Sequence, residues 1–257
     1  MSRENRVRAI KGGQLDGIPK DKTINLIVLY SGGFDSTALL NMAIKTKKEN
    51  KNIQKVYALY VKSNMLNTGK VELEEKYTER FISYINENND TNVEFLKITR
   101  DVPDLDEYAK YAENAYDLIF MNAINSVVPF IGGAELNIVL DGTLDKDSRN
   151  YHVPFYKRTV ESFNLYFRTV DIWMEFPLLS TDKPRIISYL LSEGLYDYCT
   201  CCEDPNKDEF CYSCKDHTNA LIELLMEYEI YGGIVPNDGD IEFIKKELSR
   251  ILGGEWN

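Results

Sequence analysis

Residues 26–40, LIVLYSGGFDSTALL, constrain the fold more than any other stretch of this chain. An apolar run typical of a buried strand leads into two adjacent glycines, and a helical pattern follows at once. Adjacent glycines allow a positive φ and a close approach of the backbone to a ligand, and the first N–H groups of a helix attract anions. The segment therefore predicts a strand, a tight turn and a helix, with an anion-binding site at the turn.

Strand-like and helix-like patterns alternate along the following residues. Helices are expected over 36–48, 71–86, 105–115 and 117–130, between strands over 24–30, 55–61, 93–98 and 136–140. Strands separated by helices imply crossover connections and a parallel sheet. We therefore expect an α/β fold, an open parallel sheet with helices on both faces. Ligands bind at the carboxyl ends of such strands, where residues 31–37 and 141–151 should face one crevice.

These patterns divide the chain into three parts. Residues 1–22 are polar and are expected to form an extension of uncertain order, while residues 23–180 form the α/β domain. Residues 181–257 are expected to be helical, with Asp182 capping a helix that ends near Gly194 and further helices over 218–228 and 240–252. A second full domain is not expected at this length.

Composition and charge exclude several classes of function. Lys and Arg number 30 against 41 Asp and Glu, a formal net charge of −11, which argues against a nucleic-acid partner bound through many phosphate contacts. No apolar run has the length of a membrane span, and the N-terminal residues lack the hydrophobic core of a signal peptide. The sequence therefore predicts a cytoplasmic protein without a membrane partner.

All five cysteines lie between positions 199 and 214. In a reducing compartment such clustering indicates a metal site more than disulfides. The spacing Cys202-x8-Cys211-x2-Cys214-x2-His217 supplies four ligands of the kinds that tetrahedral Zn²⁺ prefers, and a closed set of four marks a structural site. Cys199 or Cys201 can replace Cys202 or His217 in this set, and a catalytic Cys/His pair is the alternative to metal binding.

The turn sequence Ser31-Gly32-Gly33-Phe34-Asp35-Ser36-Thr37 resembles the SGGxDS signature of the PP-loop ATP pyrophosphatases, which transfer AMP to an oxygen of their substrate. It lacks the lysine of the GxxxxGK[ST] phosphate loop. Together with the cysteine block, residues 24–225 resemble the 7-cyano-7-deazaguanine synthases, the QueC family. Those enzymes adenylate the carboxylate of 7-carboxy-7-deazaguanine, add ammonia, and use a second ATP to form the nitrile.

The resemblance implies ATP, Mg²⁺ and Zn²⁺ as cofactors. Nucleotide binding is expected from Tyr30, Ser31, Gly32, Gly33, Phe34, Asp35, Ser36 and Thr37. The catalytic residues are expected to be Asp35, Asp147 and Lys183, with the two aspartates positioning Mg²⁺. Asp35 has an alternative role as the cap of the helix that follows the turn. Cys202, Cys211 and Cys214 match three zinc ligands of the family, and His217 takes the fourth place.

The acceptor pocket departs from the family pattern. Where the family continues Tyr-Pro-Asp-Cys-Arg, this chain has Tyr-His-Val-Pro-Phe over residues 151–155, and Arg149, Lys157 or Arg158 are candidates for the lost positive charge. The expected partners are a deazapurine acid and ammonia. The alternatives are a QueC-like enzyme that joins the activated acid to an amine on a protein, in phage or antiphage defence, and a tRNA-thiolating PP-loop enzyme. Members of the family are often homodimers.

Overall fold

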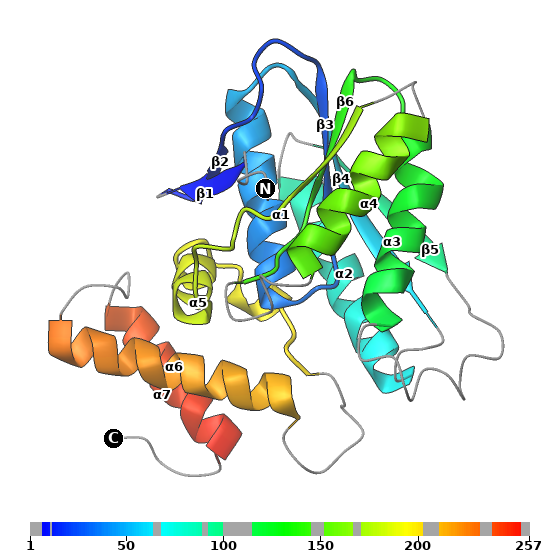
Figure 1. The fold of residues 1–257 in the computed structure, drawn as a ribbon. Helices are drawn as coiled ribbons and strands as arrows, with labels where there is room; N and C mark the ends of the chain where they lie inside the picture. Colours follow the sequence, from blue (N-terminus) through cyan, green and yellow to red (C-terminus); the bar gives the residue numbers. More distant parts are fainter. Residues whose placement is uncertain are drawn as a thin grey trace.

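The computed structural model of the protein describes residues 7–10, 12–63, 68–88, 92–99, 115–144, 152–166, 171–202, 211–231 and 238–252 (Figure 1). In chain order the elements are β1 (Arg8–Ile10), β2 (Gln14–Asp16), β3 (Ile24–Leu29), α1 (Phe34–Glu49), β4 (Ile53–Lys62), α2 (Thr68–Asn88), β5 (Val93–Thr99), α3 (Ala115–Val127), the 3-10 turn η2 (Val128–Phe130), β6 (Leu136–Leu140), α4 (His152–Tyr166), β7 (Asp171–Glu175), α5 (Lys183–Ser192), the 3-10 turn η4 (Tyr196–Tyr198), α6 (Tyr212–Tyr231) and α7 (Asp238–Leu252).

The core of the molecule is a five-stranded sheet in the order β5-β4-β3-β6-β7, and all its strand pairs are parallel. The central strand β3 is buried along its whole length, which explains why its sequence is a continuous apolar run with a single asparagine. The strand order reverses between β3 and β6, as in Rossmann-like folds. This arrangement confirms the expected α/β class with an open parallel sheet.

Side chains alternate between the two faces of the sheet and bury against different helices. On β3, Leu26 and Val28 belong to a core shared with α1, α2, α5, α6 and α7, whereas Ile27 and Leu29 pack with α3 and α4 on the opposite face. Figure 1 shows these two layers, with α1 and α5 on one side of the sheet and α3 and α4 on the other. The helical C-terminal part therefore shares the core of the α/β domain.

Within the segment expected to be an extension of uncertain order, residues 8–16 form an antiparallel hairpin. Val7 and Leu15 are buried, and the Leu15 N–H donates a 2.9 Å hydrogen bond to Oγ1 of Thr46 on α1. The Ala9 N–H donates to the carbonyl of Pro177. Strands of three residues are too short to show a period-two pattern, which is why the sequence did not reveal them.

Other elements differ from expectation at their ends. Helix α6 begins at Tyr212 instead of residue 218, and helix α4 was not expected. The cap on α5 is confirmed, because the Asp182 side chain accepts a hydrogen bond from the Arg185 N–H. The helix expected over 105–115 lies outside the described residues except for its last one. Within the described part of the chain, no helix combines the length and hydropathy needed to cross a bilayer.

A buried pair of asparagines fixes the sheet to the turn before β6. Asn25 on β3 donates to the Asn137 Oδ1 on β6 at 3.0 Å, and the Asn137 Nδ2 donates to the carbonyls of Val128 and Ile131, both at 3.0 Å. Both asparagines are fully buried. Each buried carbonyl left without a donor costs about 1–3 kcal/mol.

Replacing Asn137 with leucine is therefore expected to lower the free energy of unfolding by about 2–4 kcal/mol, measured by urea denaturation. The matched control is Asn88→Ala, because Asn88 makes one exposed hydrogen bond to the Tyr84 carbonyl. That control is expected to change the free energy by about 0.5 kcal/mol or less. Equal midpoints for N137L and the unsubstituted protein would contradict the role given to the pair.

Candidate active site and metal centre

The turn after β3 requires glycine at position 32 for two reasons. Gly32 has a φ of +76°, in the left-handed region that other residues avoid. A Cβ atom at this position would also lie 3.2 Å from the Tyr77 Cβ and 3.3 Å from the Thr78 backbone nitrogen on α2. The glycine therefore lets the turn pass close under α2.

The N-terminus of α1 is open to an anion. Gly33 is its N-cap and has no side chain to accept from the first N–H groups of the helix. The Ser36 hydroxyl donates to the Gly33 carbonyl at 3.2 Å and accepts from the Ser31 N–H at 3.3 Å, which holds the turn in shape. A Cβ on Gly142, after β6, would lie 3.3 Å from the Ser36 nitrogen, so this glycine keeps a second backbone segment close to the helix start.

A pocket of about 200 Å³ lies at the carboxyl ends of β3 and β6, where the strand order reverses. Its lining includes Ser31, Gly33, Asp35 and Ser36 from the turn and α1, and Asp141 and Gly142 after β6. The expected shared crevice is therefore present for residues 31–36 and 141–142. Its volume is below the roughly 300 Å³ of ordinary small-molecule sites, so it suits a phosphate-sized group.

Two residues expected to be catalytic meet beside this pocket. Lys183, the first residue of α5, places its Nζ 2.7 Å from the Asp35 Oδ2 in the first turn of α1. The lysine side chain is 13% exposed and the aspartate 26%. The Asp35 Oδ1 is buried and has no hydrogen-bond partner among the described residues. Because Gly33 is the N-cap and Asp35 pairs with Lys183, Asp35 does not cap α1.

The other residues of the expected nucleotide site divide into two groups. Tyr30, Phe34 and Thr37 are buried, and Tyr30 also lines the pocket. Burial raises the pKa of Tyr30 far above its ordinary value, which keeps its hydroxyl neutral. Ser31, Gly33 and Ser36 line the pocket, whereas Gly32 does not. Asp147, the third expected catalytic residue, lies outside the described residues.

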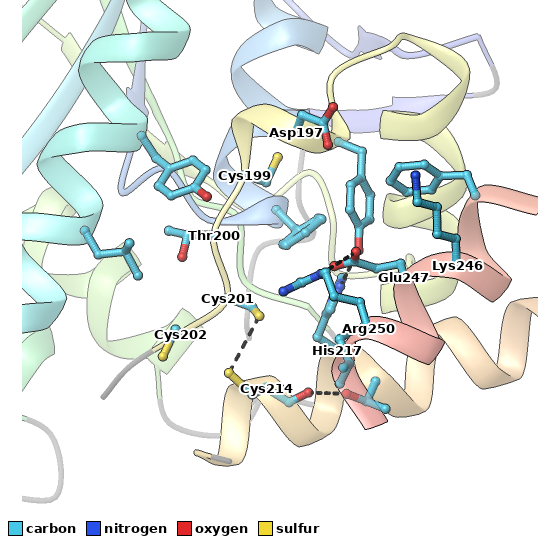
Figure 2. Close-up of a pocket in the computed structure, with 17 residues that line it drawn as sticks. Asp197, Cys199, Thr200, Cys201, Cys202, Cys214, His217, Lys246, Glu247 and Arg250 are labelled. Carbon is cyan, nitrogen blue, oxygen red and sulfur yellow. Dashed lines mark hydrogen bonds and ion pairs between the residues drawn. The ribbon is translucent and has the colours of Figure 1, made fainter. Parts of the chain in front are cut away.

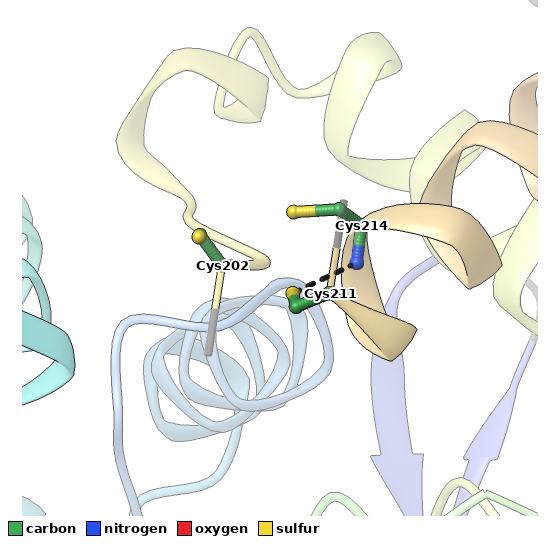
Figure 3. A group of neighbouring side chains, drawn as sticks. All are labelled: Cys202, Cys211 and Cys214. Atoms are coloured by element: carbon green, nitrogen blue, oxygen red, sulfur yellow. Dashed lines mark hydrogen bonds between the residues drawn. The ribbon is translucent and has the colours of Figure 1, made fainter. Parts of the chain in front are cut away.

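Three of the four expected metal ligands come together. The sulfurs of Cys202, Cys211 and Cys214 all lie within 4.8 Å of one another (Figure 3). The Cys214 N–H, in the first turn of α6, donates to the Cys211 Sγ at 3.4 Å. Three thiols at these distances can hold a metal ion and are compatible with zinc. The Cys201 Sγ lies 3.9 Å from the Cys214 Sγ (Figure 2).

The structure does not bring His217 to the three cysteines. Its Nε2 lies 2.7 Å from the Tyr196 hydroxyl, and its ring centroid lies 4.4 Å from that of Phe34. Burial, reinforced by the Lys183 charge, lowers the pKa of His217 to about 4, so the imidazole is neutral. The sequence argument placed His217 at the start of its helix, but α6 begins five residues earlier, and the helix carries the ring to Phe34.

A larger cavity of about 800 Å³ adjoins the cysteines, between α2, residues 196–202, α6 and α7. Its lining includes Lys246, Glu247 and Arg250 of α7 together with Tyr196 and His217, and Figure 2 shows the α7 side chains near His217. Sequence reasoning did not identify these three residues, because charged residues on an amphipathic helix are ordinarily its solvated face. No motif signals them, and packing of α7 against α6 places them there.

No protein-family model matches this sequence, and no curated protein is significantly similar to it. The fold, the turn with its ion pair and the cysteine cluster are therefore the observations from which a function is inferred.

Proposed function

We propose that the protein is an ATP-dependent ligase of the PP-loop type, which adenylates a carboxylate and passes the acyl group to nitrogen. The observation that carries this proposal is the Lys183–Asp35 pair, 2.7 Å long, beside a glycine turn at the point where the sheet order reverses. Such points are where open parallel sheets bind nucleotides. An ion pair at the N-terminus of a helix places a cation near the N–H groups that would bind phosphate oxygens.

Each step uses groups that the turn provides. The N–H groups at the start of α1 and the hydroxyls of Ser31 and Ser36 would bind the β- and γ-phosphates. The substrate carboxylate attacks the α-phosphorus and expels pyrophosphate, and Lys183 offsets the negative charge that develops on the phosphate oxygens. The amine then attacks the acyl carbon and AMP leaves. Asp35 holds Lys183 in position throughout.

One oxygen of this site is a suitable ligand for Mg²⁺. The Asp35 Oδ1 is buried without a partner among the described residues, and carboxylate oxygens are the ligands that Mg²⁺ prefers. When bound, the ion would neutralise charge on the phosphates. Zinc at the cysteine cluster would be a structural ion, because thiolate sites with closed coordination hold chain segments together.

The substrate that the resemblance favours is 7-carboxy-7-deazaguanine with ammonia. Adenylation and ammonia addition give the amide and one AMP, and a second ATP removes the amide oxygen as AMP to leave the nitrile. One nitrile therefore requires two ATP and yields two AMP and two pyrophosphates.

A second candidate is a QueC-like ligase whose acceptor is an amine on a protein. The observation that favours it concerns Lys157, which was considered as a replacement for the family's missing positive charge. Its Nζ lies 3.7 Å from the Glu175 Oε2, so its charge is already neutralised, and Arg158 is exposed. A pocket with altered charge is expected to bind a different acceptor amine after adenylation. The adenylation step itself would be kept.

The test is pyrophosphate release by the zinc-loaded protein with ATP, Mg²⁺ and 7-carboxy-7-deazaguanine, followed by mass spectrometry. We expect acid-dependent pyrophosphate, and two AMP per nitrile when ammonia is present; omission of the acid is the control. A protein mass increased by the acyl group, without nitrile, would support the second candidate. ATP binding without pyrophosphate release for any deazapurine acid would contradict both.

A further inference from the structure

Three cysteines leave one position of a tetrahedral metal site to be filled. Structural zinc sites are almost always four-coordinate and closed by protein ligands. The expected fourth ligand, His217, has its Nε2 2.7 Å from the Tyr196 hydroxyl and its ring against Phe34. Reaching the cysteines would require the imidazole to leave both contacts.

One other thiol has a distance suited to this position. In a tetrahedral site with Zn–S bonds of about 2.3 Å, neighbouring sulfurs are about 3.8 Å apart. The sulfurs of Cys201 and Cys214 are 3.9 Å apart. Cys199 is buried with its Sγ 3.5 Å from the Leu195 carbonyl, which directs it away from the cluster. We propose that Cys201 is the fourth ligand of the metal centre, in place of His217.

The backbone makes this arrangement possible. Thr200 is held against the glycine turn by a parallel bridge to Gly33, and its N–H donates to the Gly32 carbonyl at 2.9 Å. The chain leaves this bridge directly into Cys201 and Cys202, and both sulfurs then lie near the Cys214 sulfur (Figure 2). The Cys201 sulfur is not within 4.8 Å of every member of the group of three, so closing the site requires it to move toward the others.

A bound cation would also satisfy the charge of this cluster. Thiols bind a metal ion as thiolates, so four ligands of this kind bring several negative charges to one point. A divalent metal ion offsets that charge and would deprotonate the thiols on binding.

The experiment compares zinc retention by the full-length chain and three variants. Zinc content is measured after dialysis against a graded chelator series. Cys201→Ser is expected to weaken zinc binding at least tenfold. His217→Gln and Cys199→Ser are expected to retain one zinc per chain at the affinity of the unsubstituted protein. Retention by C201S together with loss by H217Q would overturn the proposal.

X-ray absorption of zinc in the unsubstituted protein removes the dependence on variants that fail to fold. Four sulfur neighbours at about 2.3 Å are expected, whereas a histidine ligand would add a nitrogen at about 2.0–2.1 Å. Two thiols this close could also form a disulfide, and mass spectrometry after alkylation tests for one. A disulfide between Cys201 and Cys214 in zinc-loaded protein would overturn the assignment. None of these readouts depends on the proposed ATP chemistry.

Discussion

Replacing Lys183 with alanine is expected to slow pyrophosphate release by about 10²–10³-fold, the usual effect of removing one preorganised group that stabilises developing charge. The loss should fall mainly on kcat, because Lys183 acts on charge that grows in the transition state. The measurement is the initial rate of pyrophosphate release at saturating ATP and acid. Lys183→Arg should restore part of the rate, since it restores the cation.

The matched control is Lys45→Ala. Lys45 on α1 also pairs with a carboxylate, Glu193, at 2.8 Å, but it lies on the part of the helix remote from the turn. Its removal is expected to change the rate by less than about twofold. The double variant Lys183→Ala with Asp35→Asn should be slower than K183A alone, because Asp35→Asn also removes the carboxylate proposed to bind Mg²⁺. Full activity of K183A would refute the role given to the pair.

Gly32→Ala is the second substitution with a large expected effect. The positive φ costs about 1–2 kcal/mol for alanine. The added Cβ would also lie 3.3 Å from a backbone nitrogen of α2, which cannot move as a flexible side chain can. We expect a total loss of about 2–4 kcal/mol in the free energy of unfolding, and ATP binding weakened more than tenfold as the turn shifts.

Gly194→Ala separates the two contributions. Gly194 has a similar φ of +68°, and no heavy atom lies within 4 Å of its Cβ position. This control is expected to lose only the conformational part, about 1–2 kcal/mol, and to bind ATP normally. Chemical denaturation and calorimetric ATP titration provide the two measurements. If the two variants lose equal stability and bind ATP equally, the contact with α2 has no role.

The predictable part of the fold is the part with continuous apolar runs or strong hydrophobic periodicity. The strand over 136–140 has the predicted ends, because a buried parallel strand is a continuous apolar run bounded by a glycine turn. The hairpin at residues 8–16 was missed because its strands have only three residues and its contacts, such as the Leu15 hydrogen bond to Thr46, are to distant residues. Sequence patterns do not encode such partners.

The candidate site was predictable where local chemistry decided it. Asp35 and Lys183 were chosen for their motif positions, and the fold brings them together across 148 residues. His217 was chosen by spacing alone, and the spacing does not show where α6 begins. Nor does it show that Tyr196 and Phe34 surround the imidazole, since both come from other elements.

The bridge between Gly33 and Thr200, with the hydrogen bond from the Thr200 N–H to the Gly32 carbonyl, ties the glycine turn to the cysteine segment. Whatever holds residues 201–202 therefore also restrains the turn, and a nucleotide that orders the turn restrains the cysteines. By thermodynamic reciprocity, any factor by which zinc tightens ATP binding must equal the factor by which ATP tightens zinc binding. If the protein binds ATP and zinc as proposed, and zinc tightens ATP binding, a cell short of zinc would hold it in a form with weakened nucleotide affinity.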